Sequence, residues 1–186
     1  FGPDAFAMVI LWLITCGYVV SGSRSLLRPL LIAFVAVIFS LAKFTLLVWS
    51  SVVFFAVLSQ LWRIRGWRAA LGLAGGSIMM LLTAWLACGQ ALSNVKEYLV
   101  SSWEISRGYA IAMIAAGPHS DLIHAAVSGG GLLLLLAISV GCSRNKIPAL
   151  FAAGISLLTL LLLWKHGFVR QDLHSAIYFL VVPCLV

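Results

Sequence analysis

Residues 30–62, LLIAFVAVIFSLAKFTLLVWSSVVFFAVLSQLW, contain one charged residue, Lys43, within a long apolar run. As a single helix these 33 residues would extend about 50 Å, whereas the hydrocarbon core of a bilayer is about 30 Å thick. After Pro29 no proline or glycine marks a turn, so a break in the helix is indicated only by the excess length and by the position of Lys43. We therefore predict two helices, each about one membrane span long, with a turn at Lys43.

The rest of the chain is equally apolar. Of its 186 residues, 63% are hydrophobic and 9% are charged, which is outside the range of soluble domains and predicts an all-α, polytopic transmembrane helix bundle. The apolar segments recur along the whole chain, so a removable signal peptide does not explain them. Six runs of span-like length lie near residues 5–20, 26–41, 44–62, 69–88, 125–142 and 147–164, and a seventh, shorter run fills 175–186.

The two ends of the chain lead to a further expectation. The seventh run stops after twelve residues, which is too short to span a bilayer, and the chain starts with FGPDAF rather than with methionine. We expect residues 1–186 to form a single transmembrane domain that is a fragment of a longer chain.

The charges predict an orientation, because cytoplasmic loops of membrane proteins carry an excess of lysine and arginine. One set of alternate loops holds seven cations and no acid: Arg24, Arg28, Arg63, Arg65, Arg68, Arg144 and Lys146. The other set holds the remaining five cations, all five acids and all four histidines. We place the first set inside and the second outside a bacterial cytoplasmic membrane. The net charge of +7 is then a topology signal, and no nucleic acid partner is expected.

The long outer loop, residues 89–124, contains an amphipathic segment. Its apolar and aromatic residues are Tyr98, Val100, Trp103, Ile105 and Tyr109, and its charged residues are Lys96, Glu97, Glu104 and Arg107. This mixture is typical of a helix that lies in the membrane interface with its aromatic rings at headgroup depth. We interpret it as a surface helix that covers the bundle.

His119, Asp121 and His124 follow this segment with the spacing H-x-D-x-x-H. Histidine and carboxylate side chains within about one helical turn can bind a divalent cation, but the fold must supply a third or fourth ligand. The alternative is a polar loop with an aspartate near a helix start. We predict no metal site here and leave the cofactor open, with a divalent cation at these residues as the only candidate.

The glycines and cysteines bear on helix packing and do not indicate a chemical site. The run Gly129, Gly130 and Gly131 either lets two helices approach closely or forms a flexible start to a span. The four cysteines are isolated in or beside apolar segments, with no spacing typical of metal or redox sites, and we interpret them as small packing residues.

Charge is most concentrated in WKHGFVRQDLH, residues 164–174, between two apolar runs. Its ionisable residues are Lys165, His166, Arg170, Asp172 and His174. A short loop between two spans holds them near one another, so that an arginine can bind phosphate while an acid and a histidine handle protons. The alternative is a structural role, in which Arg170 pairs with Asp172 and the other charges anchor the helix ends at the membrane surface.

Three quoted segments carry a resemblance to a known family: FSLAKFTLLVWSSVVFFAVLSQLWRIRGWRAALGLAGG, LLTAWLACGQ and VKEYLVSSWEISRGY. They resemble the middle of multi-pass bacterial membrane proteins related to the C-type, polyprenyl-phosphate-sugar-dependent glycosyltransferases. In those proteins an outward lysine-aromatic-Ser/Thr turn, a span, a short basic inner loop and another span follow in this order. The resemblance covers about Ser40 to Tyr109. The family usually has a catalytic aspartate in its first outer loop, where this chain has only Asp4. WKHGFVRQDLH also resembles a signature of uncharacterised bacterial membrane proteins.

The resemblance implies transfer of a sugar from a polyprenyl-phosphate carrier to an acceptor at the extracytoplasmic face, where the Lys165–His174 loop would lie. Membrane lipids and the polyprenyl-phosphate sugar would be its partners. The catalytic candidates are Asp172 as the base, with His174 and His166 as alternatives. The cations that would bind the carrier phosphate are Arg170, Lys165, Lys43 and Arg107.

A competing interpretation is a non-enzymatic membrane subunit that scaffolds a larger complex and has other membrane subunits as partners. A transporter fits less well, because no ionisable residue lies clearly in the middle of a span and no span is broken by paired glycine or proline.

Overall fold

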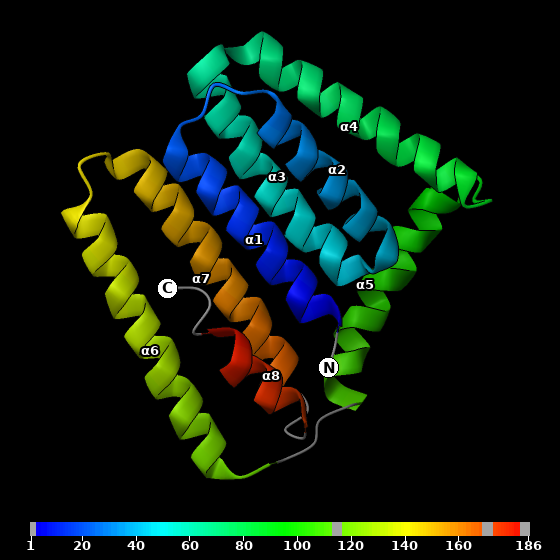
Figure 1. Ribbon diagram of the computed structural model, residues 1–186. Helices are drawn as coiled ribbons and strands as arrows, with labels where there is room; N and C mark the ends of the chain where they lie inside the picture. Colours follow the sequence, from blue (N-terminus) through cyan, green and yellow to red (C-terminus); the bar gives the residue numbers. More distant parts are fainter. Residues whose placement is uncertain (1–2, 113–116, 169–172, 183–186) are drawn as a thin grey trace. The chain divides into compact units, whose positions relative to one another are not determined.

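A computed structural model describes residues 3–112, 117–168 and 173–182 (Figure 1). In this part of the chain 89% of the residues are helical and there is no strand, so the predicted all-α class is confirmed. The helices are α1 (Pro3–Ser21), α2 (Leu27–Ala42), α3 (Phe44–Arg65), α4 (Trp67–Ala87), α5 (Asn94–Ala112), α6 (His119–Cys142), α7 (Lys146–Phe168) and α8 (Leu173–Val181).

Five of these helices, α1, α3, α4, α6 and α7, are long and apolar enough to cross a membrane. Helix α2 is apolar but has only 16 residues. Large apolar side chains are exposed along the helices, for example Phe55 at 67% and Val127 at 69%. Such exposure is costly in water but suits helices whose outer faces contact lipid. The chain is thus a helical protein with the features of an integral membrane protein.

The chain forms two compact units. The first unit comprises Phe1–Trp12 and Tyr109–Val186, and the second comprises Leu13–Gly108, so that α1 contributes to both.

In the second unit, the predicted break at Lys43 is present. Helix α2 ends at Ala42, Lys43 has an extended backbone (φ −162°, ψ 144°), and α3 begins at Phe44. The carbonyl oxygen of Lys43 accepts a 2.9 Å hydrogen bond from the Leu47 N–H and so starts the first turn of α3. The two helices then pack side by side (Figure 1). The prediction of two helices in place of one long helix is confirmed.

The core of the second unit is built on one face of α3. Trp49, Val53 and Val57 recur at intervals of four residues and are fully buried, as expected for the inward face of a helix. One turn further on, the Nε2 of the buried Gln60 donates a 3.1 Å hydrogen bond to the carbonyl oxygen of Val19, which ties the end of α1 to α3.

Helices α3 and α4 are separated by one residue, Gly66, whose N–H caps α3 by bonding to the Trp62 carbonyl oxygen at 2.8 Å. Its backbone has φ 89° and ψ 170°, a region that is essentially restricted to glycine. This residue therefore lets the chain reverse within one position, and α4 packs against both α2 and α3.

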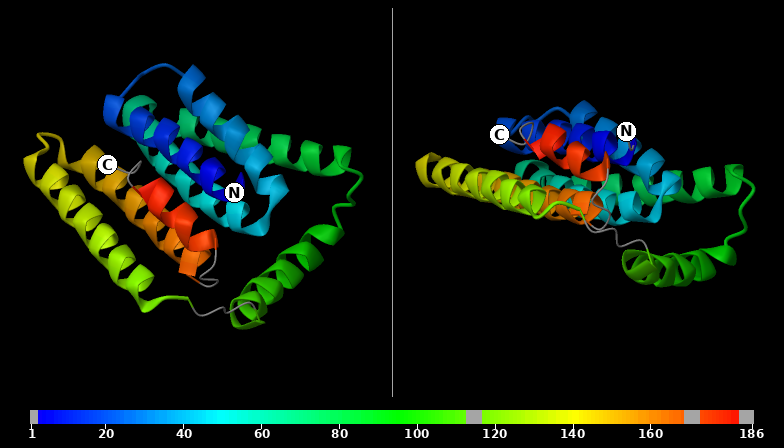
Figure 2. Two further views of the ribbon diagram at one scale, coloured as in Figure 1. Left: turned by 60° about the horizontal axis from the view of Figure 1, so that its bottom comes forward. Right: turned by 90° about the horizontal axis from the view of Figure 1, so that it is seen from below.

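In the first unit, α6 and α8 both lie beside α7 (Figure 1, Figure 2). Helices α6 and α8 also contact each other. The start of α1 is joined to this group, because the Trp12 Nε1 donates a 2.8 Å hydrogen bond to the Ser156 Oγ in α7. The apolar run that we predicted from residue 175 forms only the short helix α8 within the described residues.

Two expectations for α6 are resolved by the structure. The helix begins at His119, six residues before the predicted start of the span at Ala125. Pro118 is the N-cap, and because proline is excluded from a helix interior, it limits how early the helix can begin. Among the three glycines, Gly129 lies at a close approach, since an added Cβ would be 3.0 Å from the Tyr178 hydroxyl oxygen. Added Cβ atoms at Gly130 and Gly131 would meet no atom within 4 Å.

Candidate functional site

The charged stretch lies between α7 and α8. Lys165 is exposed in the last turn of α7. His166 lies in α7 and His174 in α8, but their side chains are outside the described part of the structure. Arg170 and Asp172 lie outside the described residues altogether. The structure therefore describes the two helix ends that carry the stretch, and the roles of its side chains stay predictions.

A cluster of four aromatic rings packs α8 against the end of α7. Trp164 and Phe168 come from the last turns of α7, and Tyr178 and Phe179 come from α8. The Tyr178 ring lies 5.7 Å from Trp164 and 5.2 Å from Phe168, measured between centroids, and meets both nearly edge-on. Edge-to-face pairs at these distances stabilise a protein beyond the burial of their area, by about 0.5–1.5 kcal/mol each. The cluster thus fixes the position of α8 against the end of α7.

A hydrogen bond extends this arrangement to α6. The Tyr178 hydroxyl, which is buried, donates to the Ala125 carbonyl oxygen at 3.1 Å. Ala125 directly follows His124, so the first turns of α6, with their H-x-D-x-x-H spacing, lie beside α8 in the same unit. The first unit therefore brings together two of the segments that the sequence singled out.

His119 and His124 are exposed and Asp121 is half-buried. In the part of the chain that the structure describes, no group of three or more His, Cys, Asp or Glu side chains could hold a metal ion. Asp121 lies instead in the first turn of α6, where its carboxylate interacts favourably with the helix dipole. The structure thus gives the aspartate a local role, and a divalent cation at these residues stays a candidate only.

The other predicted phosphate ligands lie elsewhere. Lys43 is exposed at the junction of α2 and α3, and Arg107 is exposed near the end of α5. Both belong to the second unit, whereas Lys165 belongs to the first. The convergence of these cations with Arg170 on one phosphate stays a prediction.

The amphipathic segment of the outer loop is a helix, α5, as predicted. Its Tyr98 ring lies 5.3 Å from the Trp85 ring of α4 in an edge-on contact, so the start of α5 is joined to α4. Further along, Trp103 and Ile105 are exposed. A location of this helix in the membrane interface stays a prediction.

From the sequence, the arginines between residues 24 and 68 were interpreted only as a topology signal, but several of their side chains make defined contacts. The Arg65 Nε donates to the Arg24 carbonyl oxygen at 2.8 Å, and an Arg28 amino group donates to the Ser21 Oγ at 2.9 Å. These acceptors are neutral, so the contacts leave the positive charges uncompensated. The indication in the sequence is the absence of any Asp or Glu from residue 13 to residue 95.

Comparisons of the chain with protein-family models, with curated proteins and with solved structures give no match.

Proposed function

We propose that this protein is an integral membrane, glycosyltransferase-like protein that moves a sugar from a lipid-phosphate carrier at the extracytoplasmic face, through residues Lys165–His174. The observation that supports this proposal is the aromatic cluster, which packs α8 against the end of α7, the two helices that precede and follow Arg170 and Asp172 in the sequence. Catalytic groups need a rigid support, and the packing of α8 against α7 supplies one next to this stretch of the sequence.

The reaction needs two kinds of group. As the bond between the sugar and the carrier phosphate breaks, negative charge develops on the leaving phosphate, and Arg170 and Lys165 are suited to stabilise it. The acceptor hydroxyl forms the new bond to the sugar carbon and loses its proton to a base. Asp172 is our first choice for this base, with His174 and His166 as alternatives.

The test is sugar transfer in proteoliposomes that contain the full-length protein and a polyprenyl-phosphate sugar. Arg170→Lys keeps the charge but loses the planar fork that holds two phosphate oxygens, so we expect weaker binding of the carrier. Asp172→Asn should lower turnover more than binding. Arg144→Lys, at the opposite predicted membrane face, is the control and should transfer sugar normally.

The stability of each variant distinguishes this function from a second one. A scaffold subunit is favoured by the exposed Leu99, Val100 and Trp103 of α5, whose spacing places them on one helix face that another membrane subunit could contact. If the Arg170 and Asp172 variants transfer sugar normally, or lose activity only in proportion to the loss of folded protein, the scaffold function replaces the enzymatic one.

A further inference from the structure

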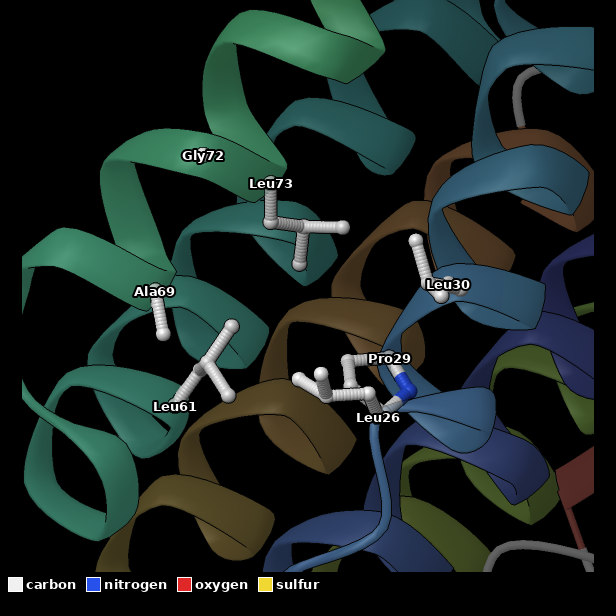
Figure 3. A pocket seen from close by; sticks show the side chains of 7 residues that line it. All are labelled: Leu26, Pro29, Leu30, Leu61, Ala69, Gly72 and Leu73. Atoms are coloured by element: carbon white, nitrogen blue, oxygen red, sulfur yellow. The ribbon is translucent and has the colours of Figure 1, made fainter.

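An open apolar groove of about 250 Å³ lies among α2, α3 and α4 of the second unit (Figure 3). Its lining includes Pro29 and Leu30 from α2, Leu61 from α3, and Gly72 and Leu73 from α4. Gly72 contributes only backbone to the lining, and there is open space beside it, since a Cβ added there would meet no atom within 4 Å. The groove can therefore accept an apolar chain.

Two arginines lie at one end of this groove. Arg65 follows the lining residue Leu61 by four positions, and Arg68 precedes the lining residue Gly72 by four positions. Residues four apart share a helix face, so Arg65 lies one turn beyond the lining in α3. Arg68 directly precedes the lining residue Ala69, and both arginines are next to the junction of α3 and α4. Both side chains are exposed.

Their positions are fixed by neutral groups. Arg65 bonds through Nε to the Arg24 carbonyl oxygen at 2.8 Å, which leaves its two amino groups for another acceptor. The Arg68 guanidinium lies over the Trp67 ring, 5.5 Å from its centroid. Along the sequence, the first acidic residue after Asp4 is Glu97. Helices α2, α3 and α4 therefore contain no carboxylate that could pair with either arginine. The complementary ligand is an anion.

We propose that this end of the second unit binds an anionic phospholipid, with its phosphate at Arg65 and Arg68 and part of one acyl chain in the groove. An apolar groove with cations at one end matches a molecule that has an anionic head and an apolar tail. Arginine suits the phosphate because two of its N–H groups can bond two phosphate oxygens at once. The sequence predicts the cytoplasmic side for these arginines, where anionic lipids concentrate. This proposal does not depend on the proposed sugar transfer.

Two other occupants fit less well. A second copy of this chain would bring its own arginines against these two, and its α2, α3 and α4 would add no carboxylate. Like-charge repulsion would therefore oppose the association of the two copies. A soluble phosphate ion would satisfy the arginines but leave the groove unfilled.

The test is native mass spectrometry of the full-length protein in detergent, with phosphatidylglycerol and phosphatidylcholine that carry the same acyl chains. We expect preferential retention of phosphatidylglycerol. The double variant Arg65→Gln, Arg68→Gln should weaken that retention roughly 30-fold, because each basic residue near an anionic lipid contributes roughly five- to sixfold and the two contributions multiply. Retention of phosphatidylcholine should change little.

A second pair of variants tests the groove. Gly72→Phe places a ring in the groove and should reduce the retention of both lipids, whereas Gly75→Phe is the matched control on the same helix. Gly75 also has open space around it but does not line the groove, so its variant should retain lipid normally. Circular dichroism establishes that both variants are folded.

Equal retention of the two lipids by the unaltered protein would overturn the proposal, and so would equal effects of Gly72→Phe and Gly75→Phe. Full displacement of phosphatidylglycerol by millimolar inorganic phosphate would also contradict it, because the ligand would then be a free anion. Loss of a dimer in Gly72→Phe with no change in lipid retention would assign the groove to a second copy.

Discussion

The Tyr178 hydroxyl donates a hydrogen bond to the Ala125 carbonyl oxygen, 53 residues earlier in the chain, at 3.1 Å. The same hydroxyl oxygen is 3.0 Å from the position that a Cβ would take on Gly129, one turn further along α6. One side chain therefore ties α8 to α6 and also explains why a glycine stands at position 129. This contact links the aromatic cluster to α6, which also packs against α7.

The pair can be tested with a double-mutant cycle. Tyr178→Phe removes the hydrogen bond and should lower the free energy of unfolding by about 1 kcal/mol. The loss is no larger because the Ala125 carbonyl oxygen also accepts a 3.1 Å bond from the Ser128 Oγ. Gly129→Ala should destabilise the unaltered protein, because the new methyl group would force the Tyr178 hydroxyl to move.

In the Tyr178→Phe background the hydroxyl is gone, so Gly129→Ala should cost clearly less than it does alone. Thermal unfolding of the four proteins in one detergent measures the coupling. Additive effects of the two substitutions would mean that the hydroxyl does not limit the space at Gly129.

Substitution of two buried polar side chains of the second unit, Thr15 and Gln60, should change the stability of the protein in different directions. Thr15 is fully buried, and its hydroxyl has no hydrogen-bond partner among the described residues. Thr15→Val replaces this hydroxyl with a methyl group of similar shape, so the thermal midpoint should stay the same or rise. Gln60→Leu removes the bond to the Val19 carbonyl oxygen and should destabilise by about 1–3 kcal/mol. A clear loss of stability in Thr15→Val would show that its hydroxyl has a partner, such as a bound water.

The sequence predicted the helices well, because their length and apolarity are local properties. The break at Lys43 follows from a run that is too long for one span, and the structure has it at that residue. The early start of α6 does not follow from apolarity, because His119, Asp121 and His124 are polar and precede the apolar run. Pro118 marked that start, since it is excluded from a helix interior and suits the position before a first turn.

The candidate site was predicted only as a set of residue types. The contact of Tyr178 with Ala125 joins segments that are far apart in the sequence, and no local pattern specifies it. The groove likewise depends on how α2, α3 and α4 pack, so its lining could not be recognised from a single helix. Charge counting found the arginines beside it, but only the structure shows that Arg65 bonds to a backbone carbonyl and not to a carboxylate.

The predicted orientation can be checked by cysteine labelling. Cys88 and Cys142 are exposed, so they and the remaining cysteines are first replaced by serine. Gln171→Cys should then react with an impermeant reagent in intact cells. Asn145→Cys, between Arg144 and Lys146, should react only after lysis, because acid-free basic loops are retained in the cytoplasm. The reverse pattern would invert the orientation of the whole chain.

Two glycine-to-alanine substitutions, six residues apart, should have opposite effects on stability. Gly66 has φ 89° and ψ 170°, where an alanine side chain is strained, so Gly66→Ala should destabilise by about 1–3 kcal/mol. Gly72 is helical and has open space around it, so Gly72→Ala should be neutral or stabilise by up to about 1 kcal/mol. Thermal unfolding in detergent compares them under one condition. Gly66→Ala should also shift Arg65, its direct neighbour, and so weaken retention of phosphatidylglycerol even below the unfolding temperature. Equal midpoints for the two variants would mean that the chain between α3 and α4 adopts a backbone that any residue can take.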